Sequence, residues 1–165
     1  MKPKQILFTV LHWTWGLSQN LVGGLGYLLL RGGHRHERWN GAFVTYIEAP
    51  GFGGVSLGKF IFMNPSRGDG WAHDTRVHEF GHCVQSIVLG PLYWVVVALP
   101  SILWCNLPPL VKWREKNKIS YYQLYCEGWA NVWGAAWTGE RFVTEEMLAR
   151  GRFGKAWDQN NRRCD

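Results

Sequence analysis

The sequence predicts one α+β domain, mainly α-helical with a small β-hairpin, that is an integral membrane protein. Three observations lead to this prediction. The chain has 165 residues, the length of one ordinary domain, so residues 1–165 are expected to fold as a single unit. Residues 5–30 and 80–111 contain no Asp, Glu, Lys or Arg, and each run exceeds the roughly 20 residues that a helix needs to cross a bilayer. The stretch between these runs is rich in β-branched and aromatic residues.

The composition and charge exclude two classes of protein. With 47% hydrophobic residues, the chain can offset its ordering entropy by burial, so intrinsic disorder is excluded. The net charge of +6 would ordinarily suggest nucleic acid as a partner. However, basic residues cluster at 31–38 and 112–118, directly after apolar segments, where they favour contact with anionic lipid. We therefore expect a lipid bilayer as a partner and no nucleic acid.

The first uncharged run, residues 5–30, is predicted to be an apolar membrane segment. Trp13 and Trp15 suit a membrane–water interface, and glycines in the second half suit close helix contact or could break the run into two shorter helices. A cleaved signal peptide is the weaker alternative, because the run is too long and polar residues 18–20 interrupt it. The basic block 31–38 is expected to be a solvated loop rather than a histidine-rich metal site.

A β-hairpin and a helix are predicted next. Within residues 41–63, two short strands at 42–48 and 55–63 are separated by the turn sequence APGFGG. A helix is then predicted over residues 71–90, and Gly90-Pro91 ends it.

Residues 91–111 are predicted to form a second apolar membrane segment or a re-entrant hairpin. Two single crossings would place the two basic blocks on opposite sides, which the positive-inside preference opposes. A hairpin broken at Pro91 and Pro100 would instead leave both blocks in the cytoplasm. An aromatic-rich helix is predicted over 120–137, and a last short helix over 145–150.

The motif His78-Glu79-Phe80-Gly81-His82 indicates a metal site on the helix 71–90. Histidines at i and i+4 share one helix face and can bind one Zn²⁺, while Glu79 can reach a water bound to that metal. In a chain of this composition the pattern would arise by chance only about 0.01 times. We expect zinc as the cofactor, although these ligand types also bind other divalent ions.

A catalytic zinc site needs a third protein ligand, and three residues are candidates. Glu48 lies in the strand region, and His73 stands five residues before the motif, a poor spacing for a shared helix face. Glu127 is favoured, because Glu127 and Asn131 lie at i and i+4, so one can bind metal while the other orients a ligating imidazole.

A hydrogen-bond donor is also needed for the oxyanion that forms during acyl transfer. The nearest tyrosines in the sequence are Tyr121, Tyr122 and Tyr125, each of which could equally serve in aromatic packing. We predict Tyr125 as a catalytic residue beside Glu79.

The combination of HExxH with a later Glu-x-x-x-Asp resembles the gluzincins, the thermolysin-like zinc metalloproteases. The resemblance implies His78, His82 and Glu127 as ligands and Glu79 as base. Asn131 stands where that family usually has Asp, so support of a ligating His would come from a neutral amide. The strings HEFGHCVQS, LGPLY and EGWAN are also similar to a group of small bacterial membrane proteins of metalloprotease type.

These observations predict a membrane-associated zinc metalloendopeptidase that hydrolyses peptides or membrane-proximal proteins. The resemblance implies a bacterial cytoplasmic membrane, and the active site is expected near its cytoplasmic face. The alternative is a noncatalytic, zinc-stabilised membrane protein that acts through partner binding. The intact Glu79 favours the enzyme, since a purely structural site needs no carboxylate beside its two histidines.

Overall fold

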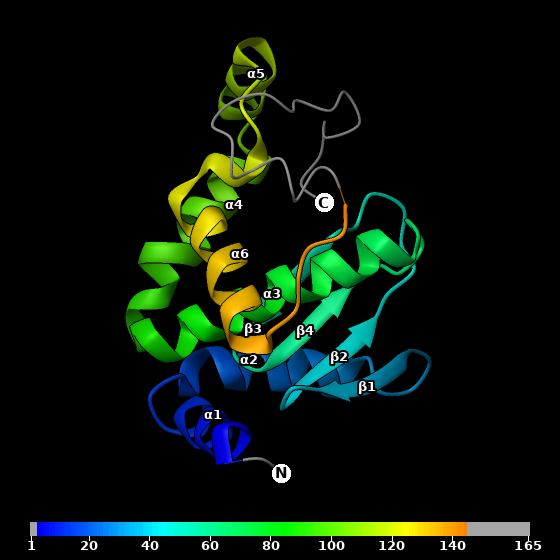
Figure 1. Cartoon of the computed structure of the whole chain (residues 1–165), viewed down its shortest axis with the longest axis vertical. Coiled ribbons are helices and arrows are strands. Elements are labelled where there is room, and N and C mark those ends of the chain that lie inside the picture. Colours follow the sequence, from blue (N-terminus) through cyan, green and yellow to red (C-terminus); the bar gives the residue numbers. More distant parts are fainter. Residues whose placement is uncertain (1–2, 145–165) are drawn as a thin grey trace.

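The computed structural model describes residues 3–144, in which a four-stranded sheet packs between helices (Figure 1). The strands are β1 (Arg35–Trp39), β2 (Ala42–Tyr46), β3 (Gly54–Leu57) and β4 (Phe60–Met63). Their order in the sheet is β1-β2-β4-β3; β2 and β4 run parallel, and the two other pairings are antiparallel. β3 therefore forms one edge of the sheet.

The prediction of one β-hairpin within residues 41–63 is wrong: this stretch contains β2, β3 and β4, and β2 pairs with β4 in parallel. Two tight turns account for the difference. Gly58, with φ +62°, turns the chain within the stretch predicted as one strand and separates β3 from β4. Asn40 and Gly41 both have positive φ and join β1 to β2, so the second half of the basic block 31–38 forms an edge strand rather than a loop. Asn-Gly is a strong hairpin signal, because both central residues of a type I′ turn need positive φ.

The integral membrane part of the predicted fold class is also contradicted. Residues 5–30 form two helices, α1 (Pro3–Trp13) and α2 (Leu17–Leu29), separated by a turn at 14–16. Among the described helices, none alone is long and apolar enough to cross a membrane. Asp69–Leu92 and Trp94–Asn106 pass that test only as a pair, and they are bent by 119° at their junction.

Two helices cover opposite faces of the sheet (Figure 1). α3 (Asp69–Leu89) packs its Phe80 in one core with Ile61 and Met63 of β4. On the other face, Gly23 and Gly26 of α2 lie close to the β3–β4 hairpin; a Cβ on Gly23 would come within 2.1 Å of the Leu57 carbonyl oxygen. Both faces of β4 are thus covered, which explains why all four of its residues are buried.

The chain after α3 is a series of short helices. They are η1 (Gly90–Leu92), η2 (Trp94–Ala98), α4 (Leu99–Asn106), α5 (Pro108–Asn117), η3 (Tyr121–Gln123) and α6 (Tyr125–Thr138). η2 is a π-helical turn directly before Pro100, which has no N–H to donate to the carbonyl of Val96. That carbonyl instead accepts a hydrogen bond from the hydroxyl of Tyr125. The predicted helix at 145–150 lies outside the described residues.

Candidate metal centre

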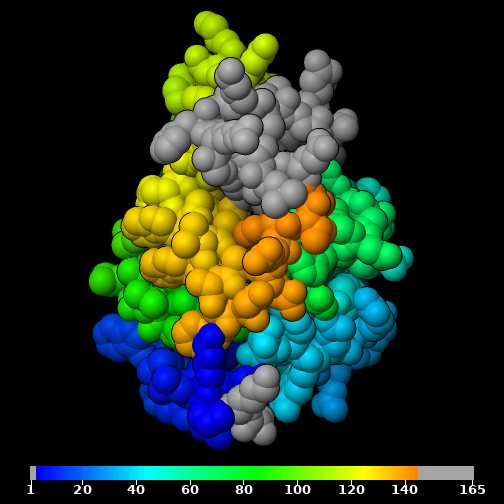
Figure 2. Space-filling view, viewed as in Figure 1, coloured from blue at the N-terminus to red at the C-terminus, as the bar shows by residue number. Residues whose placement is uncertain are grey.

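Two glycines bring α3 and α6 into backbone contact. A Cβ on Gly81 would lie 1.8 Å from the carbonyl oxygen of Ala130, and one on Gly134 would lie 2.1 Å from that of Val77. Real side chains do not approach so closely, so only glycine permits this crossing. From the side shown in Figure 2, α6 and the segment after it, in yellow to orange, form the surface of this region.

This crossing brings three potential metal ligands together. His78 and His82 come from α3, and Glu127 comes from the first turn of α6. The Nε2 atoms of His78 and His82 lie 3.1 Å and 3.3 Å from Oε2 of Glu127. One donor atom from each residue lies within 4.8 Å of the others, and all three residues are buried. This group could hold a metal ion.

Neutral amides orient both imidazoles. Nδ1 of His78 lies 2.6 Å from Oδ1 of Asn131, and Nδ1 of His82 lies 2.7 Å from Oε1 of Gln85. An amide oxygen can only accept, so each Nδ1 carries the proton and donates it. Each Nε2 lone pair is then directed at the centre of the group, the tautomer that metal binding requires.

Gln85 was not anticipated as part of the site. It follows His82 by three residues, so it lies on the same helix face, and this spacing could have indicated the contact. Its Nε2 also donates to the carbonyl of Cys126, at 2.7 Å. Gln85 therefore connects the second histidine of α3 to the start of α6.

The electrostatics of the group fit a cation. Burial alone would raise the pKa of Glu127, but the charges and hydrogen bonds of His82 and His78 hold it well below its usual range. Burial would likewise lower the pKa of His82, yet Glu127 raises it to about 9. A carboxylate facing two imidazole nitrogens at hydrogen-bond distance needs positive charge between them, which protons or a metal ion can supply.

Glu79 lies beside the group, but it is not one of the three residues whose donor atoms converge. Its side chain is buried, and its Oε2 has no hydrogen-bond partner among the described residues. Burial raises the pKa of Glu79, while His78 and His82 oppose that increase. The carboxylate fits against β3 because residue 54 is glycine: a Cβ there would lie 2.7 Å from Oε1 of Glu79.

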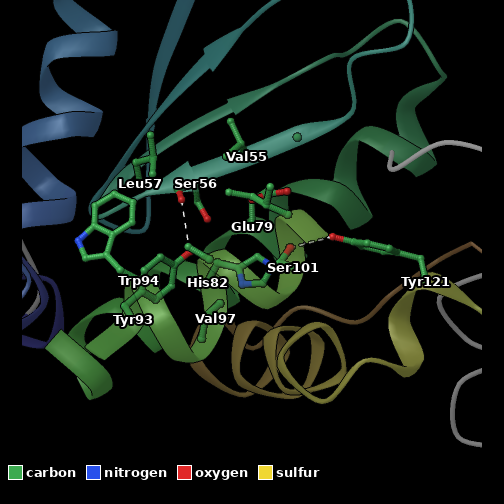
Figure 3. Close-up of a pocket in the computed structure, with 13 residues that line it drawn as sticks. Val55, Ser56, Leu57, Glu79, His82, Tyr93, Trp94, Val97, Ser101 and Tyr121 are labelled. Atoms are coloured by element: carbon green, nitrogen blue, oxygen red, sulfur yellow. Dashed lines mark hydrogen bonds between the residues drawn. The ribbon is translucent and has the colours of Figure 1, made fainter. Parts of the chain in front are cut away.

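A cavity of about 100 Å³ adjoins Glu79 and His82 (Figure 3). Its walls come from β3, from η2 and α4, and from Tyr93 and Tyr121. Burial raises the pKa of both tyrosines well above the usual value, so their hydroxyls stay protonated. The hydroxyl of Tyr93 lies 3.5 Å from the carbonyl oxygen of Ser56, and that of Tyr121 lies 3.1 Å from Oγ of Ser101. The sequence did not indicate Tyr93, because it lies far along the chain from the predicted helix 120–137 that carries Glu127.

Tyr125 lies away from this cavity. Its hydroxyl bonds to Val96, and its side chain is 42% exposed. Two residues along an α-helix correspond to a rotation of about 200°, so a helix that directs Glu127 inward directs Tyr125 outward. This geometry was accessible from the sequence. Tyr122 instead places its ring against that of His78, with centroids 5.2 Å apart.

The two other candidate ligands also lie elsewhere. Glu48 borders a separate cavity with His34 and Tyr46. Nδ1 of His73 lies 3.0 Å from a carboxylate oxygen of Asp74. The structure thus brings His78, His82 and Glu127 together and leaves Glu48 and His73 outside the group.

No family model matches this chain, and comparison with curated proteins and with solved structures finds no significant match. The functional argument therefore depends on the geometry of the site and on the motifs within it.

Proposed function

We propose that this protein is a zinc-dependent endopeptidase of gluzincin type. The observation that carries the proposal is the position of Glu79, a buried carboxylate beside the His78–His82–Glu127 group that also lines a cavity. Its Oε2 has no hydrogen-bond partner among the described residues. A structural metal site is closed by its ligands, whereas a catalytic one keeps an open position next to a general base. The cavity beside His82 and Glu79 would supply that open position.

The ligand set and the residues around it support distinct roles. A zinc ion bound by the two histidines and Glu127 would supply a Lewis acid and lower the pKa of a coordinated water. Glu79 would accept a proton from the attacking water at its carboxylate and return it to the leaving amine. Tyr93 and Tyr121 line the cavity with protonated hydroxyls, and they would donate to the substrate carbonyl oxygen, on which negative charge would develop.

The edge strand β3 supports an extended peptide as substrate. Val55, Ser56 and Leu57 of this strand line the cavity beside Glu79 (Figure 3). An extended peptide could pair with this edge and present its backbone carbonyl to the metal centre. The opposite wall, with Val97, Ala98 and Ile102, would favour an apolar substrate side chain.

The proposal is tested by measuring bound metal and peptide hydrolysis in matched variants. Glu79→Gln is expected to retain about one zinc per chain and to lose at least about 100-fold in kcat, the usual contribution of a general base. Glu127→Ala is expected to lose the metal. Glu140→Gln is the control, because Glu140 is exposed and its carboxylate lies near His73 rather than near the triad.

Metal content is measured by mass spectrometry, and hydrolysis with a library of fluorogenic peptides that carry apolar residues. Unchanged hydrolysis in Glu79→Gln would overturn the mechanism. If the wild-type protein and Glu79→Gln both bind zinc and neither hydrolyses any peptide, the alternative of a noncatalytic, zinc-stabilised protein is favoured.

A further inference from the structure

Helix α2 has its polar residues inside and its apolar residues outside. Gln19, Asn20 and Gly23 are its buried residues. Its leucines face outward, and Leu21, Leu25, Leu28 and Leu29 are 57%, 60%, 62% and 76% exposed. A surface helix of a protein surrounded by water shows the reverse pattern. Exposure of this leucine stripe to water would be unfavourable, so the stripe is expected to contact another apolar surface.

The buried polar residues of α2 are used in the fold. Gln19 donates to the carbonyl of Gly90 at 2.6 Å, and Oδ1 of Asn20 accepts from the backbone N–H of Lys59 at 3.2 Å. The inverted orientation of α2 is thus held by specific hydrogen bonds. The leucines are outside because the inner face of the helix is committed to polar contacts.

A second stripe of the same kind continues from the first. Along η1, η2 and α4, Leu92, Val95, Leu99 and Ile102 recur at three- and four-residue spacing and are each at least half exposed. The two stripes meet where Nε1 of Trp94 donates to Oγ of Ser18, at 3.0 Å. The exposed Ile6, Leu7 and Val10 of α1 add to these two stripes, and we call the whole surface the apolar face.

The charges around the apolar face select its partner. Residues 5–30 and 80–111, which build the face, contain no charged side chain. Exposed basic residues follow both runs, Arg31 after the first and Lys112 after the second. Lys4 precedes the first run, but its Nζ donates to the carbonyl of Trp137. Trp13 and Trp15 are each about half exposed at the turn between α1 and α2. Apolar side chains flanked by tryptophan and basic residues match the acyl, interfacial and phosphate layers of an anionic bilayer.

A protein partner fits this surface less well. Protein–protein interfaces carry about one hydrogen bond per 100–200 Å² and are edged by polar groups of both signs. Along the exposed stripes of α2 and of η1–α4, by contrast, successive side chains offer neither hydrogen-bonding groups nor acidic residues.

We infer that the apolar face docks on an anionic lipid bilayer, with α1 and α2 lying along the membrane surface. The exposed Ile6, Leu7 and Val10 of α1 and the leucine stripe of α2 enter the boundary between headgroups and acyl chains. Arg31 and Lys112 contact lipid phosphates. The opposite side of each helix stays packed on the protein. This docking does not depend on the metal centre, so it can be tested independently of the proposed function.

The test is flotation of the full-length protein with vesicles of phosphatidylcholine, alone or with 30% phosphatidylglycerol. We expect the wild-type protein to float with both, and the bound fraction to rise with phosphatidylglycerol and fall again in high salt. The double variant Leu21→Glu/Leu25→Glu should bind at least tenfold more weakly. Val143→Glu is the matched control, because Val143 is also more than half exposed but lies beside Gly70, at the start of α3.

Three outcomes would overturn the inference. The wild-type protein could remain in the bottom fraction with both vesicle compositions. The double variant, with a circular dichroism spectrum like that of the wild-type protein, could float equally well. Finally, sedimentation in lipid-free buffer could reveal a dimer that the double variant abolishes, in which case a second copy of the chain would occupy the face.

Discussion

At the scale of residues, the candidate metal centre depends on two neutral amides. The amide oxygens of Asn131 and Gln85 accept hydrogen bonds from Nδ1 of His78 and His82, and this fixes both imidazoles with Nε2 facing Glu127. Two neutral imidazoles and one carboxylate would leave a divalent ion with a net charge of about +1. An aspartate at position 131 would cancel more of that charge. Asn131 therefore favours a more strongly polarising metal ion.

Replacing Gln85 by methionine should weaken metal binding by about 10- to 100-fold, because the imidazole of His82 loses its acceptor while the side-chain volume is nearly kept. Competition with a chromophoric chelator measures the affinity. Val88→Met, on the exposed part of the same helix, is the control and should leave the affinity unchanged. Wild-type affinity in Gln85→Met would show that the hydrogen bond does not support the site.

At the scale of elements, the crossing of α3 and α6 decides whether the site exists. Gly81 and Gly134 permit backbone contact between the helices, and that contact sets the distance from the two histidines to Glu127. The π-helical turn η2 acts in the same region, because Pro100 leaves the carbonyl of Val96 free to accept from Tyr125. The start of α6 is thus attached both to α3 and to the segment that walls the cavity.

We expect Gly81→Ala to destabilise the protein by about 3 kcal/mol or more and to abolish metal binding, since its Cβ would meet helix backbone that cannot move aside alone. Gly128→Ala on α6 provides the comparison. Its Cβ would lie 3.4 Å from the nearest atom, so this variant should be neutral or more stable by about 0.5–1 kcal/mol. Urea unfolding and metal content check both variants; equal stability of the two would refute the role of the glycine crossing.

At the scale of the whole molecule, a buried polar cluster attaches the N-terminal helices to the sheet. His12 is completely buried, and its Nδ1 donates to the carbonyl of Phe8 at 2.8 Å. Burial lowers the pKa of His12 to about 4; the carbonyl of Phe8 opposes this change and the charge of Lys59 adds to it. Nζ of Lys59 lies 3.2 Å from Oγ1 of Thr9, so the β3–β4 turn contacts α1 as well as α2.

This cluster predicts a pH dependence of global stability. In the unfolded chain His12 regains its ordinary pKa of 6.5. Between pH 6.5 and pH 4 the unfolded state therefore binds more protons than the folded state. Stability should therefore fall as the pH falls through this window. Between pH 7 and pH 5, we expect the wild-type protein to lose about 2 kcal/mol more than His12→Asn, which keeps a donor for Phe8 but does not titrate.

Urea unfolding at both pH values, with the difference taken between the two proteins, isolates His12 from the other titrating groups. An equal loss of stability in the two proteins would contradict the buried neutral histidine.

The large-scale arrangement also relates the apolar face to the metal centre. Ile102 belongs to both the apolar face and the cavity wall, and Trp94, which joins the two exposed stripes, lines the same cavity. If both proposals hold, the cavity opens beside the docked membrane surface. Peptides that partition into the interface would then reach the site without leaving the lipid.

The strands show where sequence reasoning was insufficient. The turn at Asn40-Gly41 was visible in the sequence, and so was the outward direction of Tyr125 relative to Glu127. The parallel pairing of β2 with β4 was not, because β3 lies between them in the chain but at the edge of the sheet. Such nonlocal pairing depends on how α2 and α3 cover the two faces, and no local pattern encodes it.

By itself the sequence determined the chemistry available on each helix, because i and i+4 spacing is a local property of the α-helix. It placed His78 with His82 on one face and Glu127 with Asn131 on another. Only the tertiary structure decided that these faces meet, through a glycine crossing whose contacts join residues about 50 positions apart. It also decided which side of each uncharged run is buried. Hydrophobicity indicates that a segment is unfavourable in water. Which side of the helix packs on the protein depends on the tertiary contacts of its polar residues, such as Gln19 and Asn20 of α2.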